Sequence, residues 1–177
     1  MCGKANLFQL ALLGPDCCSA NIPGAMGRAI ADRRFGYAWL GFAVALGLHV
    51  LDEATHDFLS TYNPTAQAIR ARLPFLPVPT FTFVPWLTGL LTAVALLLCL
   101  SPFAFRGARW IRIAAVPISL VIGVLNASLH LLSSAYYQRW MPGVYSSPLL
   151  ITAGLFLLVN AGGRKTEVRA DAPVAAR

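Results

Sequence analysis

The residues of this chain that could do chemistry lie inside apolar stretches, in two groups. The first group is His49, Asp52, Glu53 and His56. Because an α-helix turns by about 100° per residue, these four positions share one helix face. The second group follows a similar spacing further along the chain: Asn126, His130, Ser133 and Tyr137. An ionisable side chain in hydrocarbon costs a few kcal/mol, so the two groups predict a functional site.

A metal centre is the first chemistry that these residue types favour. Imidazole nitrogens and carboxylate oxygens bind zinc and other divalent ions, and a catalytic zinc site uses three protein ligands and keeps one position open. We therefore predict a divalent metal ion, zinc before others, with His49, Glu53 and His130 as ligands. Asp52 would be the general base or a fourth ligand, and Asn126 would steady the oxygen of the transition state.

Other interpretations of the same residues stay open at this point. Glu53 and His49 could form a metal-free proton pair, as an isomerase or cyclase needs. The stripes could also line a path for protons or ions in a small transport protein. A purely structural alternative has His49 and His130 forming hydrogen bonds between helices. His56 lies nearest the outer surface and is more typical of a solvated group than of a ligand.

Four long apolar stretches must position these groups. The chain has 57% hydrophobic and only 12% charged residues, with a mean hydropathy of +0.64. The stretches are Phe35–Ser60, Phe83–Phe105, Trp110–Tyr136 and Val144–Ala161. Each has about the 17–25 residues that cross a bilayer as a helix. We predict an all-α fold, an integral membrane bundle of four transmembrane helices over residues 35–161, with tails at 1–34 and 162–177.

The distribution of basic residues predicts the orientation of the bundle. Eleven of the 14 Lys and Arg residues lie before the first stretch, between the second and third or in the first turn of the third (Arg112), or after the fourth. Only Arg70, Arg72 and Arg139 lie in the other two loops. By the positive-inside rule both tails are cytoplasmic, and we expect the cell membrane as the location. Membrane topology thus accounts for the net charge of +7. The sequence shows no cluster of basic and aromatic residues that would predict nucleic-acid binding.

Depth in the bilayer brings the two groups together. At about 1.5 Å rise per residue, His49 lies about 22 Å along its helix from Arg34, and Asn126 about 21 Å from Arg112. The two polar stripes are therefore level, near the non-cytoplasmic side. This agreement predicts one shared site.

The connections carry three further expectations. Asn63-Pro64 is expected to end the first helix, and the Pro-rich segment up to Phe83 is either a lid over the site or a passive linker. Pro117 should kink the third helix modestly. Pro142-Gly143 predicts a tight turn on the outer side. The aromatic residues around it favour a turn at the membrane interface over a cage for the substrate. Residues 1–25 are interpreted as a disordered tail or an upstream mis-start.

The polar residues and the outer turn together resemble a family of integral membrane proteins named for an HXXEE motif. The matching segments are His49-Val-Leu-Asp52-Glu53, the later His130, and Trp140-Met141-Pro142-Gly143. Asp52 stands where the family motif has its first Glu, and Trp140 stands where the family's Tyr-x-Pro-Gly motif has Tyr. The order and spacing agree over residues 35–161. The resemblance implies a membrane protein but no particular activity, and the shorter reach of Asp52 favours Glu53 as the ligand.

The residues themselves favour an enzyme that acts on a lipid-like substrate. A metal-dependent hydrolase is the leading prediction, because the site combines three potential ligands with neighbouring polar groups at one depth. The expected partners are the lipid bilayer and a lipid-like small molecule. A transporter should show internal repeats or broken helices, and the two halves of the sequence show no convincing similarity to each other.

Overall fold

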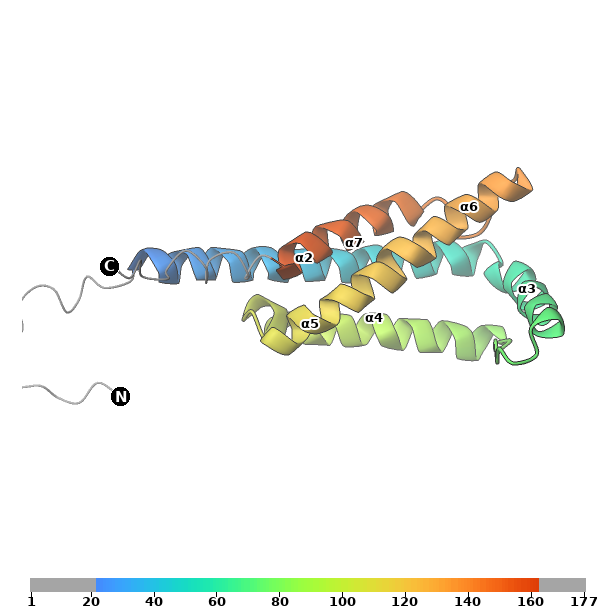
Figure 1. Cartoon of the computed structure of the whole chain (residues 1–177), viewed down its shortest axis with the longest axis horizontal. Helices are drawn as coiled ribbons and strands as arrows, with labels where there is room; N and C mark the ends of the chain where they lie inside the picture. The colour runs from blue at the N-terminus through green and yellow to red at the C-terminus, as the bar shows by residue number, and fades with distance from the viewer. Residues whose placement is uncertain (1–21, 163–177) are drawn as a thin grey trace, which may run out of the picture.

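The computed structural model describes residues 22–162, and these form helices without any strand. The predicted all-α fold is confirmed for this part of the chain. The elements are α2 (Ile22–Thr55), α3 (Phe58–Arg72), α4 (Phe83–Phe105), α5 (Arg109–Ile118), the π-helical η2 (Ser119–Asn126), α6 (Ala127–Tyr137) and α7 (Ser147–Gly162). Helices α5, η2 and α6 follow one another without a break and cross the molecule as one rod (Figure 1).

Three helices are long and apolar enough to cross a membrane. They span Met26–Thr55, Phe83–Phe105 and Arg109–Tyr137. The apolar α7 has 16 residues and is shorter. The described chain therefore has the composition of a membrane protein, with three candidate spans where the sequence predicted four.

Helix α2 is the centre of the packing. It runs the length of the bundle with α4 along one side and α7 along another (Figure 1). Phe35, Trp39 and Phe42 are fully buried on it. The Trp39 indole Nε1 donates a 2.8 Å hydrogen bond to the carbonyl of Leu97, which ties α2 to α4. These contacts hold α2 in a rotation that turns His49 and Glu53 toward the other helices.

Helix α2 ends earlier than the sequence predicted, and Pro64 does not end a helix. The chain turns at Asp57, whose φ of 54° is left-handed, a conformation that Asp tolerates better than most residues. The Thr55 hydroxyl bonds the carbonyls of Leu51 and Asp52, which satisfies groups that a helix end leaves open. A separate helix, α3, then begins at Phe58 and contains Pro64 within it.

The other boundaries differ at the ends of the helices. Helix α2 starts at Ile22, so residues 22–34 of the expected N-terminal tail are helical. Helix α7 starts at Ser147, because Val144–Ser146 belong to the turn before it. The predicted bounds of α4 are confirmed. The remaining parts of the two predicted tails, residues 1–21 and 163–177, lie outside the described residues.

A π-helical segment follows Pro117. The sequence predicted a kink there, and the structure shows π-helical bonding over Ser119–Asn126. Proline lacks the amide that continues the α-helical ladder, so a change of hydrogen-bond register after it has a physical cause. Each π turn also rotates the following side chains about the helix axis, and such segments are frequent at functional sites. The π-helical segment ends at Asn126, and His130 lies in the first helical turn of α6 that follows it.

Candidate metal centre

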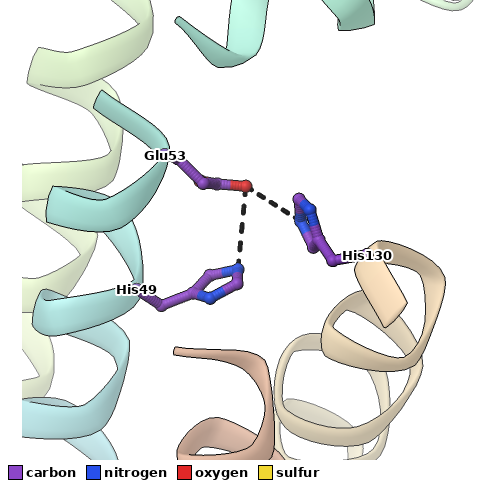
Figure 2. Close-up of side chains that lie close together, drawn as sticks. All are labelled: His49, Glu53 and His130. Carbon is purple, nitrogen blue, oxygen red and sulfur yellow. Dashed lines mark ion pairs between the residues drawn. The ribbon is translucent and has the colours of Figure 1, made fainter. Parts of the chain in front are cut away.

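Three side chains from two helices meet near one end of the bundle. His49 and Glu53 come from α2, and His130 comes from α6 (Figure 2). Glu53 Oε1 lies 3.0 Å from His130 Nε2 and 3.7 Å from His49 Nε2. The potential ligand atoms all lie within 4.8 Å of one another, and each of the three residues is buried. The structure thus brings together the three residues predicted as metal ligands.

The ring of His130 is oriented by a backbone carbonyl. Its Nδ1 lies 2.6 Å from the carbonyl oxygen of Pro142, an atom that can only accept a hydrogen bond. Nδ1 therefore carries the proton and donates it. In the neutral ring, Nε2 then presents its lone pair toward Glu53.

The ring of His49 is oriented by Ser146, which Asp52 holds in place. The Ser146 hydroxyl lies 2.7 Å from Asp52 Oδ2 and 2.8 Å from His49 Nδ1. Because a carboxylate can only accept, the hydroxyl donates to Asp52 and accepts from His49 Nδ1. The Ser146 amide also donates to Asp52 Oδ2, at 2.9 Å. His49 Nε2 is consequently the nitrogen with the lone pair.

Three electron-pair donors therefore face one point. Two imidazole Nε2 atoms and one carboxylate oxygen converge, and a proton or a cation between them removes their mutual repulsion. Ligands of tetrahedral zinc at about 2.0–2.2 Å from the metal stand roughly 3.3 Å apart. The separations of Glu53 Oε1 from the two Nε2 atoms, 3.0 and 3.7 Å, lie on either side of that value. Histidine ligands in metal sites commonly donate their other N–H to a carboxylate, a backbone carbonyl or water. Here His130 donates to the Pro142 carbonyl, and His49 donates to the Ser146 hydroxyl that Asp52 holds. The group could hold a divalent ion.

The remaining predicted residues lie around this group in different roles. The Asn126 amide Nδ2 donates a 3.3 Å hydrogen bond to His49 Nε2, so Asn126 borders the group directly. Asp52 faces Ser146 with one oxygen, and its Oδ1 lies 3.0 Å from His56 Nδ1, without hydrogen-bond geometry to any neighbour. The contacts of Asp52 are those of a residue that positions His49. The side chain of His56 is half exposed.

The Pro142-Gly143 turn covers the group. Gly143 has a φ of 83°, and a Cβ atom built there would lie 2.8 Å from His130 Nδ1 and 3.1 Å from His49 Cε1. The backbone of this turn therefore packs directly on both imidazole rings. The turn serves the site, where the sequence alone favoured an interfacial turn.

Replacing Gly143 by alanine should disturb both rings at once. The substitution forces an L-residue into a left-handed backbone conformation, which costs about 1–2 kcal/mol of stability. It also places a methyl group against both histidine rings. We expect a lower melting temperature in detergent and a lower metal content. Gly41→Ala is the matched control, because Gly41 lies in α2 with nothing within 4 Å of its added Cβ. Equal stability and equal metal content in the two variants would contradict this packing.

Replacing Ser146 by alanine should weaken metal binding without removing a ligand. His49 loses the acceptor that fixes its ring, and Asp52 loses one of its two hydrogen bonds to Ser146. Loss of such an outer-shell partner typically lowers metal affinity by about 10–100-fold. Chelator competition on the purified protein measures this change. Thr152→Ala is the control: it removes an α7 hydroxyl whose hydrogen bond goes to the Pro148 carbonyl, and it should leave the affinity unchanged.

Sequence reasoning missed two partners of the site. Ser146 appeared as one polar residue among several in the fourth apolar stretch, and its position directly after the outer turn was the available signal. The carbonyl of Pro142 has no signal of its own in a sequence, because every residue has a carbonyl.

No protein-family model, curated protein or solved structure matches the chain. The fold and the site define its class: a helical protein with candidate membrane spans and a buried His–Glu–His group.

Proposed function

We propose that this chain is an integral membrane enzyme, a metal-dependent hydrolase that acts on a lipid-like substrate. The observation that carries the proposal is the convergence of His49 Nε2, Glu53 Oε1 and His130 Nε2, each ring fixed through its Nδ1. Three protein ligands with a further position open are typical of catalytic zinc, whereas structural zinc is closed by four. Zinc is the ion that this donor set favours.

In this proposal α7 is a fourth span and both termini lie in the cytoplasm at the cell membrane. Its 16 residues cover about 24 Å as a helix, and the turn before it adds apolar length at the outer side. The excess of Lys and Arg at the other end of the bundle supports this orientation. The resemblance of the His49, His130 and Pro142-Gly143 motifs to the HXXEE family belongs to the same proposal.

The chain supplies distinct roles around the ion. A divalent ion held by three protein ligands supplies Lewis-acid activation of a carbonyl or of water. Asn126 lies beside His49 and can direct its amide N–H toward an oxygen that gains charge during the reaction. Asp52 acts through Ser146 and keeps His49 in the binding orientation. Burial of the group excludes bulk water from it.

One contact also favours a second candidate, a metal-free isomerase or cyclase. The 3.0 Å separation of Glu53 Oε1 and His130 Nε2 suits a shared proton as well as a common cation. In that case Glu53 and a histidine would exchange a proton with a lipidic substrate. The two candidates differ in whether the purified protein retains an ion.

Elemental mass spectrometry of the detergent-purified full chain tests the proposal. We expect near-stoichiometric zinc or another divalent ion in the wild type and its loss in the His49→Ala/His130→Ala double variant. His56→Ala is the matched control, because this third histidine is half exposed and should leave the metal content unchanged. Absence of metal from wild type prepared without chelators would reject the hydrolase and favour proton transfer.

A further inference from the structure

An apolar cavity adjoins the candidate metal centre. Its volume is about 280 Å³, and it lies between α2, α4 and η2. His49, Glu53 and Asn126 line it on one side. Its apolar walls include Leu46 and Val50 from α2, Leu90 and Ala93 from α4, and Val121 and Ile122 from η2. The candidate ligands therefore border a space that an apolar molecule can enter.

The cavity is polar at one end only. Leu46 lies about one turn before His49 on α2, Ile122 lies one turn before Asn126, and Ala93 lies about two turns beyond Trp86 on α4. Each of these three apolar residues lies closer to the middle of its candidate span than the polar end of the cavity does. A membrane lipid has the same arrangement, with its polar part near the interface and its hydrocarbon toward the bilayer centre.

The walls of the cavity open sideways and close at the outer end. Helix α4 packs along α2 and meets the long rod mainly at α5, and α4 and α6 then diverge (Figure 1). Ala93 and Val121 line the cavity from α4 and η2, and both are exposed. At the outer end, the stacked rings of Phe58 and Trp86 lie 5.6 Å apart, and Phe58 also lies against His130. Access from within the plane of the bilayer is therefore open.

We propose that this cavity binds one hydrocarbon chain of a membrane lipid, which enters between α4 and η2 and places the lipid's polar linkage against Glu53, His49 and Asn126. The inference deepens the proposed function and rests on it for the chemistry at the polar end. The volume is just below the roughly 300–1,000 Å³ of small-molecule sites, which suits one chain better than two. The substrate class is thus a lipid cleaved or altered where its chain meets its head.

Photo-crosslinking in nanodiscs tests the chain-binding cavity. The probe is a phosphatidylethanolamine with a diazirine at the middle of one acyl chain, and peptide mapping locates the labelled residues. Leu46 and Val50 are only 6% and 2% exposed, so lipid around the bundle does not reach them. Leu48 and Leu51, on the same helix, are about half exposed and report ordinary contact with the bilayer. We expect label on Leu46 and Val50 in addition to Leu48 and Leu51.

Two cavity variants and one control make the test specific. Ala93→Trp and Val121→Trp fill the cavity from opposite walls and should abolish label on Leu46 and Val50. Ala95→Trp adds the same side chain to an exposed position of α4 outside the cavity lining. This control variant should keep the label on Leu46 and Val50. Label on Leu48 and Leu51 should persist in all three variants, which shows that they remain folded. Absence of label from Leu46 and Val50 in the wild type, or its persistence in both cavity variants, would overturn the proposal.

The same experiment separates this inference from the proposed hydrolase. Crosslinking does not need the ion, so the His49→Ala/His130→Ala variant should still be labelled on Leu46 and Val50. Metal-free wild type that labels these residues would reject the hydrolase and keep the lipid site. Metal-bound wild type without this label would reject the lipid site and keep the metal centre.

Discussion

Glu53→Gln should lower the affinity of the protein for zinc by more than about 100-fold, the upper end of the loss seen for outer-shell changes. Glu53 Oε1 is the atom that both imidazoles face, at 3.0 and 3.7 Å. Glutamine keeps the shape and removes the negative charge, so a buried divalent ion loses the only anionic ligand of the group. Competition with a calibrated chelator in detergent measures the affinity.

Asp57→Asn is the control for this substitution. Asp57 is an exposed acid four residues further on, in the turn between α2 and α3, so its replacement removes the same charge at a distance from the rings. Its zinc affinity should equal that of the wild type. An equal loss in both variants would mean that general charge, and not coordination by Glu53, governs binding.

The core of the site followed from the sequence because helical geometry is regular. A spacing of four residues places His49 and Glu53 on one face, and the rise per residue places His130 at their depth once the charged ends are aligned. The structure has these three residues within 4.8 Å. Ser146 and the Pro142 carbonyl escaped prediction, because their contacts depend on how the turn before α7 folds back over the rings.

The fold followed from the sequence where one strong signal decided an element. Helix α4 contains no ionisable residue, follows a Pro-rich segment and ends before Arg106, and its predicted bounds are those observed. The end of α2 depended on competing local signals. Pro64 was the stronger breaker by residue type, yet side-chain bonds from Thr55 and the left-handed Asp57 end the helix first. Hydrogen bonds of this kind depend on rotamers that a sequence does not reveal.

Arg112 shows a similar limit at the other end of the bundle. From the sequence, Arg112 was only a charge that marks the cytoplasmic end of the third apolar stretch. In the structure its guanidinium is buried, with Nη2 2.8 Å from Asp32 Oδ1 and Nη1 2.8 Å from the Asn160 carbonyl oxygen. It also lies 4.3 Å from the ring centre of Phe35. One cation thus joins α2, α5 and α7, and the pairing with Asp32 neutralises it.

Asp32→Asn should therefore destabilise the protein by about 3 kcal/mol, the lower end of the loss when a buried ion pair loses one partner. The lower end applies because Asp32 keeps about a quarter of its side chain exposed. Adding Arg112→Met should recover more than half of that loss, since the second change removes the unpaired charge and leaves an apolar side chain on Phe35. The free energy of unfolding in mixed micelles measures each variant, with Arg109→Met as the control for an exposed arginine of the same helix. If the double variant is less stable than Asp32→Asn, the hydrogen bond from Arg112 to Asn160, and not charge neutralisation, is what holds these helices together.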